Sequence, residues 1–148
     1  MRNIRLKSLA FIAISSIFLY SCGKTGTYPD IPQITFKSIN PQEVHKATLP
    51  DNGVIQITMG FRSAGNMTQD SLYVEQSNNP GYNPYPMPTS TPDQKNLEGN
   101  IVFNLFKTYI YVTQNPLGDT VHFNIFVRDP SGKNSDTIQT SQIVIINN

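Results

Sequence analysis

Apolar and polar side chains alternate with a period of two through most of the chain after residue 33, and this alternation constrains the fold more than any other feature. It is clearest in the segment 53–61, where Ile55, Ile57 and Met59 share one face. Successive side chains of a β-strand point to opposite faces of its sheet, so this pattern predicts a strand with one buried face.

Further segments show the same alternation or a short β-branched and aromatic run, and none after residue 22 shows helical periodicity. About seven strands predict an all-β fold, an immunoglobulin-like antiparallel β-sandwich. In 119–128, alternate residues from Val121 to Val127 are expected to face the core, and those from His122 to Arg128 to face outward. The further segments are 34–39, 72–74, 101–106, 109–113, 119–128 and 138–146.

Residues 77–100 interrupt this pattern, because five prolines and several glycine and asparagine residues fall within them. We therefore expect a long loop of polyproline-like character, which in a small domain is typically functional or mobile. The loop carries Tyr82, Tyr85 and Met87, which are candidates for a recognition patch. The alternative is that the two rings hold the loop onto its own sandwich.

The first 21 residues have the organisation of a secretory signal peptide. Residues 1–8 carry three basic side chains and no acidic one, and residues 9–20 form an apolar run. A basic start, a short apolar stretch and a small residue before the cleavage site are typical of such signals. The apolar run is shorter than the roughly 20 residues that span a bilayer comfortably.

The sequence around Cys22 resembles the lipobox that is read by lipoprotein signal peptidase. Leu19 is the aliphatic residue at −3, Ser21 the small residue at −1 and Cys22 the cysteine at +1, although Tyr20 stands where alanine, serine or threonine is commoner. The resemblance implies that Cys22, the single cysteine of the chain, carries a lipid anchor. The alternatives are an ordinary signal peptide cut near Ser21, or an anchor helix with an incidental cysteine.

These boundaries divide the chain into a signal peptide at 1–21, a lipidated Cys22 with a flexible tether at 22–32, and the sandwich at 33–148. The tether is rich in glycine, proline and polar residues. Gly23 replaces the aspartate that retains lipoproteins in the inner membrane of enteric bacteria, so we expect an outer-membrane location. No acidic run follows Cys22, which favours the periplasm-facing leaflet over the cell surface.

Charge and motif content exclude several functional classes. Removal of the signal peptide leaves eight basic against ten acidic residues, with no basic patch for nucleic acid. His45 and His122 have no histidine, cysteine or carboxylate at ligand spacing, so we expect no metal site. No catalytic motif or cofactor fingerprint occurs, and we predict a protein that is not an enzyme and holds no cofactor.

Residues 119–135 resemble the C-terminal part of a group of small bacterial envelope lipoproteins with immunoglobulin-like or fibronectin-III-like folds, whose members are mostly uncharacterised. The opening of that group is matched by 31–36. The resemblance implies a sandwich and an envelope location, and no activity. Where that group often has an acidic loop suited to Ca²⁺, the segment 61–70 has Arg62 and keeps only Asp70, which argues against a metal there.

Three tripeptides fit the pattern Asp, then Ser or Thr, then an aliphatic residue, which is a sequon for bacterial envelope O-glycosylation. Their hydroxyl residues are Ser71, Thr120 and Thr137. Glycans there would be bulky and solubilising. The alternative is that these residues are simply turn residues that lead into strands.

The leading hypothesis is a non-catalytic, membrane-anchored envelope lipoprotein that binds or scaffolds another envelope component, a protein or a glycan. A second hypothesis is an extracellular glycan- or peptide-binding lipoprotein that works with an outer-membrane transporter. A third is an unrecognised hydrolase. An unpaired edge strand or flat apolar patch favours the first, an exposed aromatic ledge the second, and a cleft lined by carboxylates the third.

Overall fold

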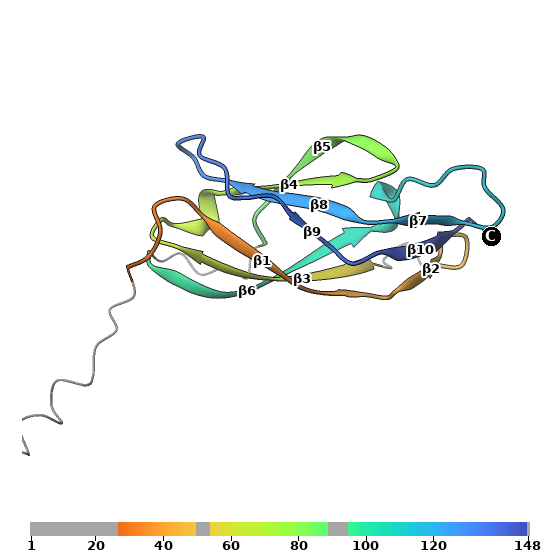
Figure 1. Ribbon diagram of the computed structural model, residues 1–148, viewed down its shortest axis with the longest axis horizontal. Helices are drawn as coiled ribbons and strands as arrows, with labels where there is room; N and C mark the ends of the chain where they lie inside the picture. Colours follow the sequence, from red (N-terminus) through yellow and green to blue (C-terminus); the bar gives the residue numbers. More distant parts are fainter. Residues whose placement is uncertain (1–26, 50–53, 89–94, 148) are drawn as a thin grey trace, which may run out of the picture.

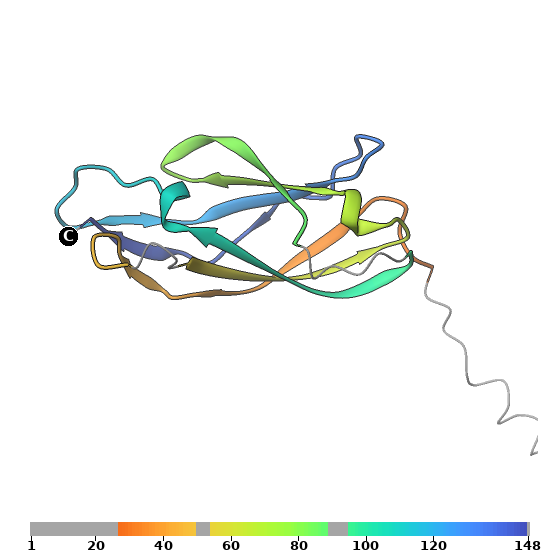
Figure 2. The same ribbon diagram turned by 180° about the vertical axis from the view of Figure 1, so that it is seen from behind.

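The computed structural model describes residues 27–49, 54–88 and 95–147, and its strands form three sheets. Figure 1 shows these sheets as two layers that face each other along the long axis of the molecule, and Figure 2 shows the same layers from behind. The prediction of an all-β fold is confirmed. Within the described residues, no helix is long and apolar enough to cross a membrane.

The first layer is built around β3 (Val54–Ser63), which pairs antiparallel with β1 (Gln33–Asn40) on one side and β6 (Leu97–Phe106) on the other. The alternation predicted in 53–61 is confirmed, because Ile55 and Ile57 are fully buried. The β3–β6 pairing is regular over ten residue pairs and therefore holds β6 firmly along one of its two edges.

The second layer contains four strands in the order β5-β4-β8-β9. Neighbouring strands in this layer are antiparallel. The four strands are β4 (Ser71–Gln76), β5 (Asn79–Pro86), β8 (Phe123–Arg128) and β9 (Ile138–Gln139). β4 and β8 supply the centre of this layer. Their inward side chains include Leu72 and pack against the inward side chains of the first layer.

A third, smaller sheet continues the sandwich at the end nearer the C-terminus (Figure 1). In it, β10 (Ile143–Ile146) pairs parallel with β2 (Glu43–His45) and antiparallel with β7 (Asp119–Val121). The described residues form ten strands, where about seven were predicted. Three extended stretches account for the difference, because β1–β2, β7–β8 and β9–β10 are each interrupted by one to three residues.

The core lies between the layers, and the inward set predicted for 119–128 is confirmed. Val121, Phe123, Ile125 and Val127 are at most 1% exposed. Phe126 was expected to face solvent and does lie on the outer face of β8, yet it is only 9% exposed. The rings of Tyr73 and Tyr82 cover it.

The expected loop at 77–100 is largely replaced by strand. β5 occupies 79–86, and β6 begins at Leu97. Pro84 and Pro86 lie two residues apart, so the N–H groups that they lack fall on the same side of β5. A strand at the edge of a sheet makes no ladder bonds on its outer side, so it tolerates prolines there.

The predicted strand at 109–113 is also absent. The chain there forms the 3-10 helix η3 (Lys107–Tyr109) and an irregular segment. The side chain of Gln76 holds that segment, because its Nε2 donates to the Tyr111 carbonyl (2.7 Å) and its Oε1 accepts from the Tyr111 N–H (3.0 Å). A side chain thus satisfies the backbone groups that a neighbouring strand would otherwise pair.

Candidate functional site

Tyr82 belongs to an aromatic cluster on the outer face of the second layer. Tyr73 and Phe126 stack with their ring centroids 4.8 Å apart, and Tyr82 packs edge-on against Phe126 at 4.9 Å. The guanidinium of Arg128 lies over the Tyr73 ring at 4.7 Å. We call these four residues the outer aromatic cluster. The contacts tie β5 to β4 and β8, which explains why Phe126 is covered.

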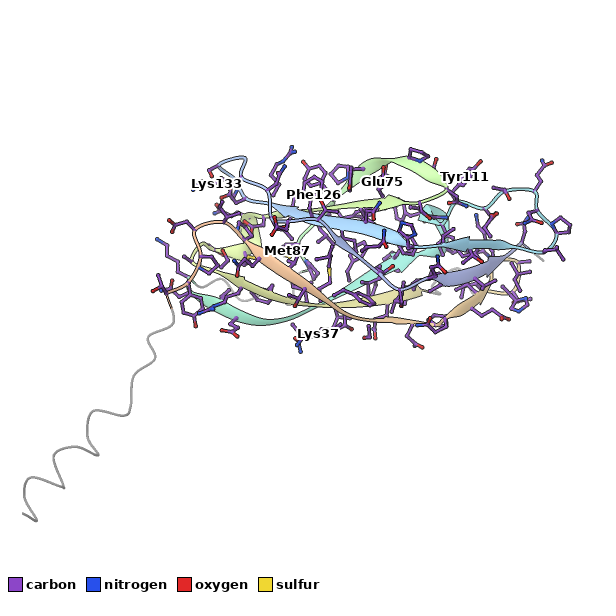
Figure 3. All side chains as sticks on the ribbon, viewed as in Figure 1. Lys37, Glu75, Met87, Tyr111, Phe126 and Lys133 are labelled. Atoms are coloured by element: carbon purple, nitrogen blue, oxygen red, sulfur yellow. The ribbon has the colours of Figure 1, made fainter. Side chains whose placement is uncertain are left out.

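The polar side chains beside the outer aromatic cluster already have partners. Glu75 accepts hydrogen bonds from the Gly81 N–H (3.0 Å) and from Asn124 (3.0 Å), and Gln139 donates to Asn124 (3.3 Å). The first of these bonds, followed by the second, lowers the pKa of Glu75. Figure 3 places Glu75 and Phe126 on this same layer. These mutual contacts favour a structural role for the face.

Tyr85 lies on the opposite face of β5 from Tyr82, so the structure does not bring these two predicted patch residues together. The Tyr85 ring packs edge-on against Phe103 (5.1 Å) and Tyr109 (5.5 Å). Burial, and then the neighbouring Tyr109, raise the pKa of Tyr85. Met87, the third predicted residue, is 6% exposed and lies between the layers (Figure 3).

A groove of about 410 Å³ opens where β5 and β6 approach each other from the two layers. We call it the β5–β6 groove. One wall comes from β5 and the residues after it, and the other from β6 and η3. None of its lining side chains is charged, and most are aromatic, aliphatic or proline. They are Tyr85, Pro86, Pro88, Val102, Phe103, Asn104, Phe106 and Tyr109.

Three exposed apolar side chains line this groove, namely Val102, Phe106 and Tyr109. Seven large hydrophobic residues are exposed in the described part of the chain, and five of them fall between residues 102 and 117. Single exposed hydrophobics are ordinary, whereas a contiguous group marks an interaction site. The five are Val102, Phe106, Tyr109, Tyr111 and Leu117.

A second, more polar hollow lies beside the groove and shares Tyr85 and Tyr109 with it. It also includes Asn79 and Asn83 of β5. Lys46 lines this hollow too, and its ammonium donates to the Ile110 carbonyl (2.7 Å). The apolar groove therefore borders a region of amide and backbone hydrogen-bonding groups.

The titratable groups do not assemble a reactive centre among the described residues. His45 Nε2 lies 2.9 Å from Glu43 Oε1 in an exposed pair, and His122 lies between β7 and β8. No group of three histidine, cysteine, aspartate or glutamate residues is placed there to hold a metal ion. Asp70 is 5% exposed, and burial, with a smaller effect of Asp129, raises its pKa to about 6.

The three hydroxyl residues predicted as glycosylation sites differ in their exposure to solvent. Thr120 in β7 and Thr137 before β9 are exposed, whereas Ser71, the first residue of β4, is half-buried. The predicted lipobox and the cysteine predicted to carry the lipid lie outside the described residues. They are Leu19, Tyr20, Ser21 and Cys22.

Val102 and Phe106 were not predicted as site residues. A signal was present, because Val102 and Phe106 are two of the three residues on the outer face of 101–106, and both are apolar. The other face is apolar throughout, with Ile101, Phe103 and Leu105. A strand with one buried face carries polar residues on its solvent face, so apolar residues on both faces point to a covered or binding surface.

Comparison with known proteins found no matching family, no matching curated protein and no matching solved structure.

Proposed function

We propose that this chain is a non-catalytic envelope lipoprotein, anchored through Cys22, whose immunoglobulin-like sandwich binds another envelope component through the β5–β6 groove. The single observation that carries the binding role is the group of exposed apolar side chains around the groove. Burying such side chains against a partner is favourable at roughly 25 cal/mol per Å².

The strand order supports the immunoglobulin-like assignment. In such folds, strands A, B and E form one sheet, and strands C, F and G form the other, to which a strand C′ can be added beside C. Here β1-β3-β6 corresponds to A, B and E, and β5-β4-β8-β9 corresponds to C′, C, F and G. The interrupted pairs β7–β8 and β9–β10 then each count as one strand.

The N-terminal sequence supports the lipid anchor. A basic start, an apolar run and a lipobox-like Cys22 are the features that direct a chain to export and lipidation. Figure 1 places residues 27–32 at one end of the sandwich and loop 110–118 at the other. A protein anchored in the outer membrane through this N-terminus would present that loop and the adjoining groove away from the anchor.

Photo-cross-linking in the native host tests the binding role. Benzoylphenylalanine at Phe106 is expected to form a discrete adduct with an envelope component. The same group at Lys37, an exposed residue on β1 outside the groove, is the control. The absence of an adduct at Phe106, or the same adduct from both positions, contradicts the proposal.

A second candidate function is the capture of an extracellular peptide or glycan beside an outer-membrane transporter. The observation that favours it is the ring pair of Tyr85 and Tyr109 in the groove, since tyrosine combines apolar area with a polar hydroxyl. The mass of the adduct formed at Phe106 distinguishes the two candidate functions, because it identifies either an envelope protein or a small ligand.

A further inference from the structure

We propose that the β5–β6 groove takes an extended, apolar peptide segment of a partner protein, which adds as a strand to the free edge of β6. This inference rests on the proposed binding function and names its ligand class. It follows from the backbone of β6, from the composition of that strand and from the chemistry of the groove.

The first argument is the free edge of β6. This strand is last in the order β1-β3-β6 and is paired with β3 along one edge. Within the described residues, the backbone of 101–106 makes no hydrogen bond other than those of this pairing. Backbone groups along an unpaired edge form a template for another strand.

The second argument is that this edge lacks the protection that β5 has. β5 contains Pro80, Pro84 and Pro86, whereas 101–106 has neither proline nor charge. A six-residue segment of high β-propensity without proline or charge readily pairs with other strands. Natural sheets protect such edges with lysine, proline or bulges, so an unprotected one indicates a partner.

The third argument is the chemistry of the groove beside the edge. Val102 and Phe106 lie on the outer face of β6, Phe103 on the inner face, and all three line the groove. The groove therefore follows the edge of the strand itself. An occupant there meets apolar rings and prolines as well as backbone groups, which suits alternating apolar side chains on an extended backbone.

A second copy of this chain fits the groove less well than a lone segment. The β6 strand of a second copy would bring its own β5 wall, with Tyr85 and Pro86, to the same place. A single extended segment carries no such wall, so we assign the groove to a segment of another protein.

The binding test uses the full-length lipoprotein in detergent and a fluorescent pool of capped peptides. Each peptide has about seven residues, near the usual strand length, and alternates threonine with valine, isoleucine, leucine or phenylalanine. We expect saturable binding and slower hydrogen exchange in 101–106. A matched pool with an N-methyl group at every residue keeps the side chains but has no N–H group to donate along either edge, and is expected not to bind.

A matched pair of variants locates the site. Val102→Lys places a charge on the groove-lining strand, and Ser38→Lys places the same charge on exposed β1, which does not line the groove. We expect Val102→Lys to weaken binding about tenfold or more and Ser38→Lys to leave it within about twofold. Equal binding by both variants, or by the N-methylated pool, overturns strand addition.

The outcomes separate this inference from the proposed function. A cross-linked partner at Phe106 together with no peptide binding leaves the binding function standing and overturns strand addition. No adduct and no peptide binding overturns both. Concentration-dependent dimerisation that Val102→Lys abolishes, measured by sedimentation, assigns the groove to a second copy and also overturns the inference.

Discussion

The ring of Tyr85 meets the ring of Tyr109 at 87°, with the two centroids 5.5 Å apart, and both residues line the β5–β6 groove. Tyr85 is half-buried and also packs against Phe103, whereas Tyr109 is 59% exposed. The two tyrosines therefore touch one another but differ in role. Tyr85 belongs to the packing between the layers, and Tyr109 belongs to the surface.

Substitution of each tyrosine separates these roles. We expect Tyr85→Ala to lower the free energy of unfolding by about 2–4 kcal/mol, because it leaves a cavity beside Phe103. Tyr109→Ala loses little more than one ring contact, so we expect about 1 kcal/mol or less. Urea denaturation measures both values, and equal losses contradict this division.

Two phenylalanines on outer faces make a second comparison. Phe126 is 9% exposed beneath the outer aromatic cluster, and Phe106 is 45% exposed at the groove. We expect Phe126→Ala to destabilise the protein by about 3 kcal/mol and Phe106→Ala by less than about 1 kcal/mol. Thermal unfolding of the two variants checks this. A large loss for Phe106→Ala would assign that ring to the fold rather than to binding.

Asp70 predicts a pH dependence of stability. Burial, with a smaller effect of Asp129, raises the pKa of the Asp70 carboxyl from 3.8 to about 6 in the folded protein. Between these values the folded state binds more protons than the unfolded state, so the contribution of Asp70 to stability falls as the pH rises through this window.

Asp70→Asn removes this contribution. Relative to wild type, the variant is expected to gain up to about 3 kcal/mol on going from pH 3.5 to pH 7. Urea denaturation at both pH values measures the change. A difference between variant and wild type that does not vary with pH contradicts the assignment to Asp70.

Two glycines with positive φ differ in their surroundings. A Cβ at Gly118 (φ +84°) would lie 2.7 Å from the Ile145 carbonyl oxygen, whereas one at Gly132 (φ +88°) meets nothing within 4 Å. We expect Gly132→Ala to cost about 1 kcal/mol from backbone conformation alone. Gly118→Ala adds a clash with backbone and is expected to cost about 2 kcal/mol more. Similar losses in urea denaturation contradict the close approach.

The proposed lipidation of Cys22 can be tested independently of the sandwich. Radiolabelled palmitate is expected to enter the wild-type protein and not the Cys22→Ala variant, and the variant is expected to leave the membrane fraction. An unlabelled wild-type protein, together with a variant that still fractionates with membranes, contradicts lipidation.

The sequence predicted those parts of the fold in which side-chain alternation alone decides the structure. Ile55 and Ile57 of β3 and the inward residues Phe123 and Ile125 of β8 are buried as expected. Each of these strands has one face against the core, so its pattern is readable without knowing its neighbours.

The errors arose where contacts distant in sequence decide the structure. Prolines predicted a loop at 79–86, but pairing with β4 makes it an edge strand. The run at 109–113 has strand-forming residues, yet Gln76, 35 residues away, captures the backbone of Tyr111. Because this segment is a strand, the side chains of Tyr82 and Tyr85 lie on opposite faces, and the structure does not bring these two candidate residues together.

The prolines of β5 have a consequence for stoichiometry. Pro84 and Pro86 deprive the outer side of β5 of amide donors, so the second layer is a poor template for growth at that margin. A segment received at β6 would therefore extend the first layer without giving the second a matching extension. Of these two edges, only that of β6 is expected to take an added segment, so together they provide one binding site per molecule rather than two.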